Sequence, residues 1–350
     1  MEKMINKRTY NHSVAFWDPR TPTTSVDEEG DRFRPRRKRR CKSLPCWYKR
    51  CQGSRPSGVG HADESRRRGQ WLGRLLGSAV WSDGCWDEER VALLQFQYVY
   101  SREVSDCCEW EWVECNITTR RVTQLSLNNG LLWDLEFFNA SLFLPFEELR
   151  SLDLSYNGLV GCVENEELNV LSNVENLFLD STPLDINFLQ SIGVLTSLKT
   201  LSLSYCGLTD LTTHQGLCYL NNLEELNLNG NALSGAIPSC LGNLTSLRYL
   251  DISNNRFTGN IASSPLTNLT MLQFISLSKN QFQLPVSFNS FANHSHLKVL
   301  LADENKLVAE PIGFQIWWPK FQLMIFSLFN CTIEEHGTLR LPNFLYSNVI

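Results

Sequence analysis

Four closely spaced cysteines are the residues whose types and spacing most clearly indicate chemistry: Cys85, Cys107, Cys108 and Cys115. Thiols at such spacings either bind zinc or form disulfides, and many structural zinc sites combine cysteine with histidine. No histidine lies near these thiols, so we predict no metal site and two disulfides, for which three pairings are possible. Cys218 and Cys240 are candidates for another disulfide. Three further cysteines are expected to be buried as small apolar residues, namely Cys162, Cys206 and Cys331.

Asn-x-Ser/Thr sequons are a second feature with chemical meaning, because they accept N-linked glycans in secreted proteins. Besides Asn11, the sequence contains sequons at Asn116, Asn139, Asn243, Asn268, Asn293 and Asn330. Three of these, at Asn243, Asn268 and Asn293, recur at one interval, which predicts the same outward-facing position in a repeated unit. Disulfides together with glycans indicate the secretory route.

The sequence contains no recognisable catalytic pattern. Its six histidines are scattered, and none lies at a useful spacing from a nucleophile or from other metal ligands. There is no GxGxxG, no GxxxxGK[ST] and no kinase signature. We therefore predict no enzyme activity and no cofactor. His294 and His296 are expected to be surface residues on a connecting segment.

The template LxxLxLxxNxL repeats nine times and organises most of the chain. The repeats begin at Val122, Leu149, Val174, Leu198, Leu223, Leu247, Leu272, Leu297 and Leu323. Within each repeat, apolar and polar residues alternate, as in a short strand with one buried face. Parallel stacking of such strands at about 4.8 Å would join their leucine faces into one elongated core. We predict an α/β solenoid with a parallel β-sheet on its concave face.

The ninth template position should fasten the turn that follows each strand. It is asparagine in five repeats, at Asn157, Asn231, Asn255, Asn280 and Asn305. A buried amide there can bond backbone groups that would otherwise lack partners. Cys206 and Cys331 occupy this position in two repeats and can form such bonds only weakly. We expect those two repeats to be less well fastened.

The segment LSGAIP, residues 233–238, contains the LxGxIP extension of plant leucine-rich repeats, and FTGNI and LVGCV contain parts of it. From about Gly84 to its end, the chain resembles this plant-specific subtype, which forms a right-handed superhelix. The segment DEERVALLQF and the four clustered cysteines are similar to the N-terminal cap of plant leucine-rich-repeat receptors and of related polygalacturonase inhibitors.

The resemblance implies the structure of the cap. It implies disulfides between Cys85 and Cys107 and between Cys108 and Cys115. The cap should also begin with a helix that has an acidic first turn. Helical spacing predicts that its buried stripe consists of Val91, Leu94 and Tyr98.

Charge divides the chain into a basic leader and an acidic remainder. Residues 1–80 contain 19 Lys/Arg and 8 Asp/Glu, a balance of +11, which leaves 13 and 29, or −16, for the other residues. The acidic part is unsuited to nucleic acid, whose binding depends on basic contacts to phosphates. We interpret residues 1–80 as a disordered leader or misassigned exon, 81–121 as the cap, and 122–350 as nine repeats with a truncated tenth.

Outward-pointing side chains of the strands are the candidate binding surface. Template positions three, five, seven and eight point away from the predicted core, and several hold aromatic or charged residues that suit the anchoring of a ligand. The candidate ligand-binding residues are Phe178, Tyr205, Tyr249, Asp251, Phe274, Lys279 and Asp303. A glycan on Asn330 would cover one end, so we expect a partner to dock over the repeats that begin between Leu198 and Leu272.

The resemblance implies a receptor-like protein at the extracellular face of the plant plasma membrane. Such a protein would recognise a peptide, glycan or protein ligand and signal through a co-receptor kinase in defence or development. The full-length family members also have a secretory signal and a membrane anchor, neither of which is recognisable in this sequence. Two alternatives are a secreted inhibitor of cell-wall-degrading enzymes and a truncated gene product without an independent function.

Overall fold

We describe the protein from a computed structural model, which defines residues 84–96, 106–129, 140–158, 168–184, 188–211, 215–308 and 320–333. The predictions for residues 1–80, Tyr98, Asn139, Cys162 and the tenth repeat lie outside these described residues. Within the described ranges, none of the helices has both the length and the apolar character that a bilayer crossing requires.

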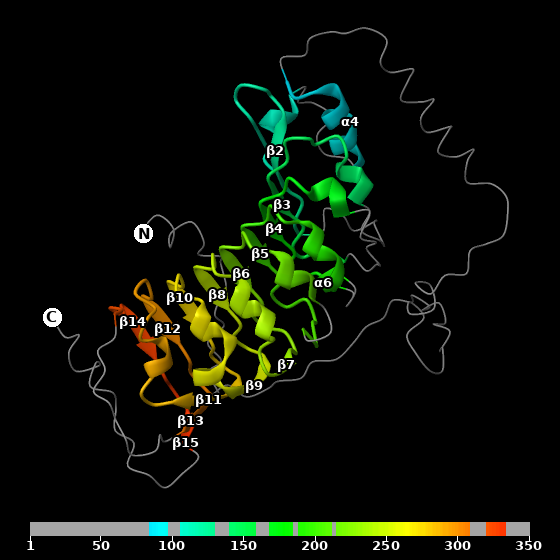
Figure 1. Cartoon of the computed structure of the whole chain (residues 1–350). Coiled ribbons are helices and arrows are strands. Elements are labelled where there is room, and N and C mark those ends of the chain that lie inside the picture. Colours follow the sequence, from blue (N-terminus) through cyan, green and yellow to red (C-terminus); the bar gives the residue numbers. More distant parts are fainter. Residues whose placement is uncertain are drawn as a thin grey trace, which may run out of the picture. The chain divides into compact units, whose positions relative to one another are not determined.

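A ten-stranded sheet takes one strand from the cap and one from each of the nine repeats (Figure 1). In spatial order its strands are β1 (Val113–Cys115), β2 (Val122–Ser126), β3 (Ser151–Asp153), β4 (Asn176–Phe178), β5 (Thr200–Ser202), β6 (Glu225–Asn227), β8 (Tyr249–Asp251), β10 (Phe274–Ser276), β12 (Val299–Leu301) and β14 (Ile325–Ser327). The cap strand β1 pairs with β2 in antiparallel fashion, and all the later pairs are parallel.

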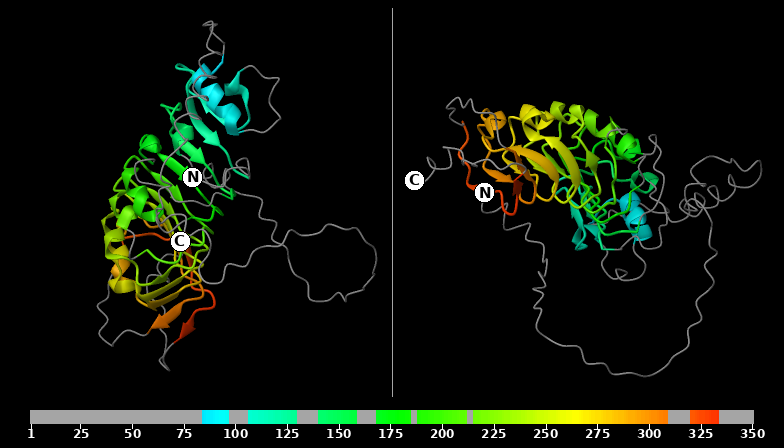
Figure 2. Two further views of the ribbon diagram at one scale, coloured as in Figure 1. Left: turned by 90° about the vertical axis from the view of Figure 1, so that its right-hand side faces the viewer. Right: turned by 90° about the horizontal axis from the view of Figure 1, so that it is seen from below.

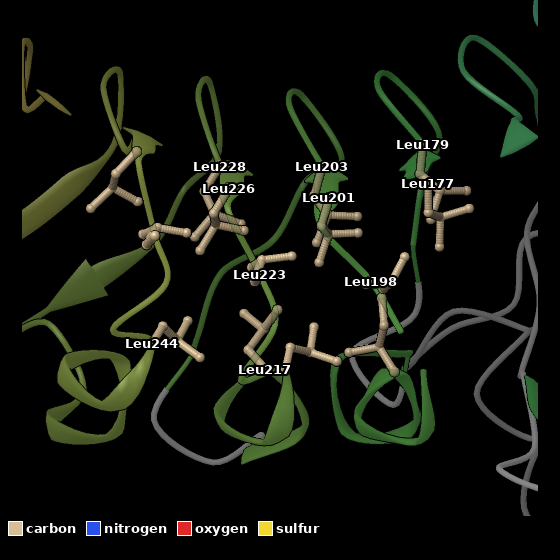
Figure 3. Close-up of a cluster of buried hydrophobic side chains, with 14 of the residues drawn as sticks. Leu177, Leu179, Leu198, Leu201, Leu203, Leu217, Leu223, Leu226, Leu228 and Leu244 are labelled. Atoms are coloured by element: carbon tan, nitrogen blue, oxygen red, sulfur yellow. The ribbon is translucent and has the colours of Figure 1, made fainter. Parts of the chain in front are cut away.

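The register of the strands places leucine beside leucine. Leu201 lies opposite Leu226, which lies opposite Leu250, and Leu250 lies opposite Ile275. These four side chains are at most 1% exposed, and Figure 3 shows the first two stacked within the same core. Complete burial of each such side chain contributes about 1.5–3 kcal/mol. The single spine predicted from the repeat is confirmed.

Short helices form the opposite side of the stack, so that the sheet lies on the inner, concave side (Figure 2). They are α6 (Phe188–Ser191), η2 (Ala140–Phe143), η3 (Asn169–Leu171), η4 (Ile192–Val194), η5 (Gln215–Tyr219), η6 (Ser239–Asn243), η7 (Ile261–Ser263), η8 (Pro265–Asn268) and η9 (Asn289–Phe291). Cys218 in η5 is bonded to Cys240 in η6, so a disulfide joins two neighbouring repeats on this side.

A second parallel sheet, which the sequence analysis did not predict, follows the turns that leave the main strands. Its order is β15 (Thr332–Ile333), β13 (Lys306–Val308), β11 (Gln281–Pro285), β9 (Arg256–Asn260) and β7 (Ser234–Gly235). Phe257 of β9 and Phe282 of β11 are 1% exposed, and their rings stack at 6.0 Å. These rings extend the core beyond the leucine spine.

Asparagine at the ninth template position fastens a repeat to the one before it. The Asn255 amide nitrogen donates to the carbonyl oxygens of Leu228, Ile252 and Ser253, at 2.9, 3.2 and 3.0 Å. Its carbonyl oxygen accepts from the backbone N–H of Leu233 at 3.0 Å. Asn231, Asn280 and Asn305 form the same set of bonds. The predicted role of this asparagine is confirmed.

Cys206 replaces this asparagine with fewer bonds. Its thiol lies 3.1 Å from the carbonyl oxygen of Leu179 and 3.5 Å from that of Ser204. A thiol is also a weaker donor than an amide. Burial raises the pKa of the Cys206 thiol to about 12. The thiol is therefore an unreactive structural group, as expected from the sequence.

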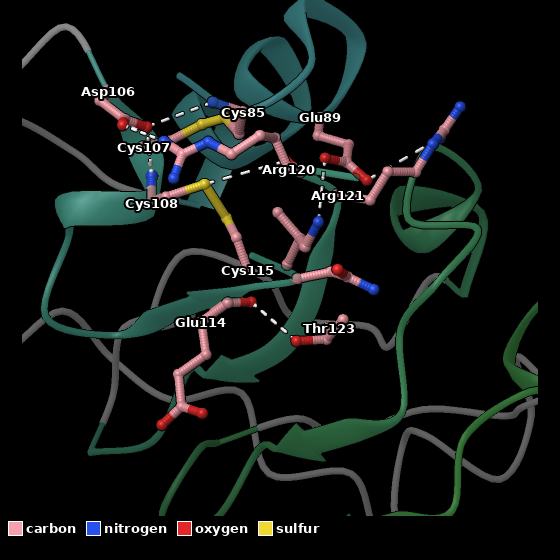
Figure 4. The surroundings of a disulfide bond; sticks show 12 residues. Cys85, Glu89, Asp106, Cys107, Cys108, Glu114, Cys115, Arg120, Arg121 and Thr123 are labelled. Carbon is pink, nitrogen blue, oxygen red and sulfur yellow. Dashed lines mark hydrogen bonds and ion pairs between the residues drawn. A yellow bond between two sulfur atoms is a disulfide. The ribbon is translucent and has the colours of Figure 1, made fainter. Parts of the chain in front are cut away.

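The cap contains the two disulfides that the resemblance implied, Cys85–Cys107 and Cys108–Cys115 (Figure 4). It begins with α4 (Asp87–Phe96), and Cys107 and Cys108 start η1 (Cys107–Glu109). The predicted buried stripe of α4 was wrong, because Leu94 is exposed. The helix instead buries Ala92, Leu93 and Phe96, and the Phe96 ring stacks on Phe143 of the first repeat at 5.4 Å.

Glu89 joins the cap to the first repeat (Figure 4). Its side chain is fully buried, and one carboxylate oxygen accepts from the backbone N–H of Val122, at 3.1 Å, where β2 begins. The other oxygen has no hydrogen bond and lies 3.9 Å from the Arg121 guanidinium. Arg121 also covers the ring of Trp86 at 4.0 Å. Burial raises the pKa of Glu89 to about 7.

His294 is buried, contrary to the prediction of a surface residue. Its exposure is 0%, and it takes the position that leucine has in neighbouring repeats, at Leu244 and Leu269. Its two ring nitrogens lie 3.2 Å from the carbonyl oxygens of Phe291 and Leu266, respectively. A neutral imidazole can donate to only one of them. Desolvation nevertheless lowers the pKa of His294, while the two carbonyls oppose that shift.

Candidate functional site

Four apolar side chains form a row on the concave face, at template position three of four neighbouring strands. Tyr249 lies opposite Phe274, which lies opposite Val299, and Val299 lies opposite Ile325. We call these four residues the apolar strip. Ile325 is 54% exposed, and the other three are half-buried. The strip is therefore at least partly exposed along its length, and a glycan on Asn330 would cover its Ile325 end.

The centre of the apolar strip is a preorganised aromatic pair. The rings of Tyr249 and Phe274 stack with centroids 4.4 Å apart and an interplanar angle of 9°. The two rings stack on each other and are partly buried, so less side-chain entropy remains to be lost on binding. Aromatic side chains held in this way are typical anchors of protein interfaces.

The apolar strip ends sharply at β8. In the earlier strands, position three is polar: Ser151, Asn176, Thr200 and Glu225. Phe178 stands at position five of β4, between Asp153 and Ser202 of the adjacent strands. The structure therefore does not bring Phe178 together with Tyr249 and Phe274.

The candidate carboxylates Asp251 and Asp303 bond within the sheet. Asp251 accepts from the backbone N–H of Ser253 at 2.9 Å and from its hydroxyl at 2.5 Å. Burial raises the pKa of Asp251, and these hydrogen bonds counteract the shift. Asp303 accepts from the Ser327 hydroxyl and, at 2.6 Å, from the N–H of Phe329 in the next repeat. Both carboxylates thus fasten strand ends, which the sequence pattern did not reveal.

Tyr205 and Lys279 belong to a turn beyond the strands. They occupy template position eight, where every repeat has a left-handed backbone, with φ of 54° and 56° at these two residues. Tyr205 is 61% exposed, and its ring lies against Gly230, where a Cβ would come within 2.5 Å of it. The Lys279 ammonium lies 4.0 Å from Glu304. Both side chains border the strands and do not stand on them.

A groove runs beside the strands, outside template positions three, five, seven and eight, from which the binding surface was predicted. Its walls come from template position two, with Arg150, Glu175, Lys199, Glu224 and Arg248 in succession. We call it the lateral groove. The alternation of charge at position two over five consecutive repeats was the sequence signal that could have revealed it.

The described sequons differ in accessibility. Asn243, Asn268, Asn293 and Asn330 are exposed. The amide nitrogen of Asn116 donates to Glu148 at 3.2 Å, and its oxygen accepts from two N–H groups of the following turn. A glycan on Asn116 would replace the contact with Glu148. Glycosylation of these residues remains a prediction.

Residues 196–257 match a family model described as leucine rich repeat. This match and the parallel strands with their asparagine-bonded turns define the chain as a leucine-rich-repeat solenoid. Among the described residues, no group of three or more His, Cys, Asp or Glu side chains could hold a metal ion.

The relatives of the chain are plant receptors. Receptor-like protein 56 of Arabidopsis thaliana is 37% identical over 35% of this chain, and Cuscuta receptor 1 of Solanum lycopersicum is 36% identical over 31%. The matched segments are 15% and 11% of those two proteins. The resemblance to plant leucine-rich-repeat receptor-like proteins is confirmed.

Solved structures extend the comparison to most of the fold. The leucine-rich-repeat ectodomain of the Arabidopsis thaliana membrane receptor kinase GASSHO1/SCHENGEN3, solved with CASPARIAN STRIP INTEGRITY FACTOR 2, is 26% identical with a TM-score of 0.53. The likeness covers 73% of this chain and 31% of that ectodomain. A plant ice-binding protein has a TM-score of 0.54 at 22% identity, covering 75% of this chain and 92% of the other. The second likeness shows the fold alone.

Proposed function

We propose that the protein is a non-catalytic recognition module of a plant cell-surface receptor, and that its apolar strip binds a peptide or protein ligand. The ligand would bind at the extracellular face, and a partner receptor kinase would transmit the signal. The stacked pair of Tyr249 and Phe274 is the observation that carries this proposal. The names of the relatives and the complex of the similar ectodomain with CASPARIAN STRIP INTEGRITY FACTOR 2 support it.

Within the site, each group has a separate role. Tyr249 and Phe274 anchor an apolar side chain of the ligand, and Val299 and Ile325 extend the contact along the strip. Lys279 orients the ligand by its charge, and Tyr205 offers a ring and a hydroxyl at the border of the sheet. Asp251 and Asp303 hold the strand ends in place, so they support the binding surface without contacting the ligand.

A displayed peptide library provides the test, because the ligand need not be known beforehand. The full chain, expressed through a secretory pathway, would be used to select binding peptides. Tyr249→Ala and Phe274→Ala should each weaken the selected peptides by about tenfold or more, as expected when an aromatic anchor is truncated. The melting temperature should change little, because both side chains are partly exposed.

Tyr219→Ala is the matched control, because Tyr219 is a 60% exposed tyrosine in η5 on the opposite side of the stack. It should leave binding unchanged. Selected peptides that bind the Tyr249 and Phe274 variants as tightly as the natural protein would contradict the assignment of the apolar strip.

A further inference from the structure

The lateral groove presents cations at every second strand. Consecutive backbone hydrogen bonds join position two of each repeat to the next: Glu175 to Arg150, Lys199 to Glu175, Glu224 to Lys199 and Arg248 to Glu224, at 2.7–2.8 Å. The same pattern continues through Gln273 to Lys298. Arg150, Lys199 and Arg248 therefore form a row in the groove, and the backbone register continues it to Lys298, beyond the residues that line the groove. We call these four residues the cation row, with two strand spacings between neighbours.

The carboxylates between these cations lie deeper in the groove. The side chains of Arg150, Lys199 and Arg248 are 51–53% exposed, whereas those of Glu175 and Glu224 are 29% and 39% exposed. Glu175 contacts Arg150 at 3.5 Å and Lys199 at 2.6 Å, and Glu224 contacts Arg248 at 3.5 Å. The acids thus hold the cations in position, and the partner meets mainly the cations.

The spacing of the cation row selects among polypeptide conformations. Neighbouring strands lie about 4.7–4.9 Å apart, so cations two strands apart repeat every ~9.6 Å. A polyproline II helix has three residues per turn and rises about 9.3 Å per turn, so every third side chain lies on one face at nearly this interval. Over three intervals the mismatch is about 1 Å.

Other regular conformations fit less well. In an extended strand, side chains of one face repeat every ~6.7 Å, which does not match the row. In an α-helix, two turns span about 10.8 Å, and the mismatch grows to roughly 4 Å over three intervals. A polyproline II helix also loses little conformational entropy when it binds, because it is already ordered in the free peptide.

We propose that the lateral groove binds a proline-rich peptide segment in the polyproline II conformation, with an acidic residue at every third position facing the cation row. Each acid of the ligand would meet one cation in a charge-assisted hydrogen bond. The hydroxyl and amide groups of Ser197, Asn222 and Thr245, which also line the groove, can bond the exposed carbonyl oxygens of such a helix. This site is separate from the apolar strip and does not depend on the function proposed for it.

The test compares two synthetic peptides of identical composition on the full-length protein. One contains four Glu-Pro-Pro units, and the other has its four glutamates in succession followed by eight prolines. At low ionic strength, the periodic peptide should bind about tenfold or more tightly, because only its acids can reach all four cations together. Equal affinities, or no binding of the periodic peptide, would overturn the proposal.

Charge-reversal variants of the protein provide a second test of the proposal. Lys199→Glu should weaken the periodic peptide about tenfold or more, since it replaces an attractive contact with a repulsive one. Arg256→Glu changes the net charge equally but lies in β9 of the second sheet, so it should change affinity less than about twofold. Equal losses in the two variants, or equal binding of unstructured polyglutamate, would show a general charge effect and refute recognition by spacing.

Discussion

Replacing Glu89 with glutamine should remove a pH-dependent weakness in the joint between the cap and the repeats. The Glu89 carboxylate is fully buried and has one oxygen without a hydrogen bond. Glutamine has nearly the same shape and keeps an oxygen that can accept from the N–H of Val122. The substitution removes the negative charge, and it also places two N–H donors where the oxygen has no hydrogen-bond partner, a cost that does not depend on pH.

The size of this destabilisation follows from the pKa of Glu89. Burial raises this pKa from 4.5 to about 7, against the smaller opposing influence of the Val122 N–H and of Arg121. At 1.36 kcal/mol per unit, the ionised carboxylate destabilises the folded protein by about 3 kcal/mol. Two further acids lie nearby, Glu147 on Arg121 and Glu148, whose charge adds to the rise.

The raised pKa of Glu89 determines whether its contribution to stability grows or falls with pH. The unfolded chain ionises Glu89 near pH 4.5, and the folded protein does so only near pH 7. The contribution of protonated Glu89 to the stability of the fold is therefore fully present below about pH 4.5 and is lost as the pH rises through 7. Raising the pH from 4.5 to 8 should therefore change the difference in stability by about 3 kcal/mol in favour of Glu89→Gln over the natural protein.

Thermal unfolding at pH 4.5, 6 and 8 would measure this difference, because subtraction of the two proteins cancels the titration of other carboxylates. Hydrogen exchange at Val122 would detect the effect even if the cap opens separately from the repeats. Glu88→Gln is the control, since Glu88 is an exposed neighbour in the same helix. A pH-independent difference between the natural protein and Glu89→Gln would refute the reasoning.

Three further predictions concern the repeats. Cys206→Asn should restore the hydrogen bonds formed at this position in other repeats and stabilise the protein by about 1–2 kcal/mol in chemical denaturation; a lower midpoint would show that the site cannot accept an amide. Because burial lowers the pKa of His294, the natural protein should lose stability relative to His294→Leu as the pH falls below about 6.5, and comparison of the two proteins by melting at pH 5 and 7 would show this. Replacing both Cys218 and Cys240 with serine should cost about 3 kcal/mol for a loop of 22 residues, and an unchanged denaturation midpoint would argue against their disulfide.

The fold was predictable because its information is local and repeated. Leucines at two fixed intervals predict a buried strand, and nine copies leave parallel stacking as the arrangement that buries all of them. The asparagine at position nine was predictable for the same reason. The second sheet was not, because its buried residues, such as Phe257 and Phe282, follow turns whose direction the template does not specify.

The candidate site was less predictable, since exposure alone does not distinguish a ligand contact from a structural bond. Asp251 and Asp303 resemble ligand-binding carboxylates in the sequence, and only the structure reveals their bonds to strand ends. His294 was misplaced because its neighbours in the sequence are polar, although it occupies a leucine position of the repeat. The pairing of Tyr249 with Phe274 followed directly from their shared template position.

The left-handed residue at position eight has a consequence for how this molecule can change over generations. Residues as different as Tyr156, Lys279 and Glu304 occupy it with nearly the same φ. The backbone penalty is therefore already included in the eight repeats that have a non-glycine residue there, whereas Gly230 avoids it. The eight turns with a non-glycine residue at position eight can thus exchange one side chain for another with little effect on folding. New binding preferences can arise there while the architecture beneath them stays the same.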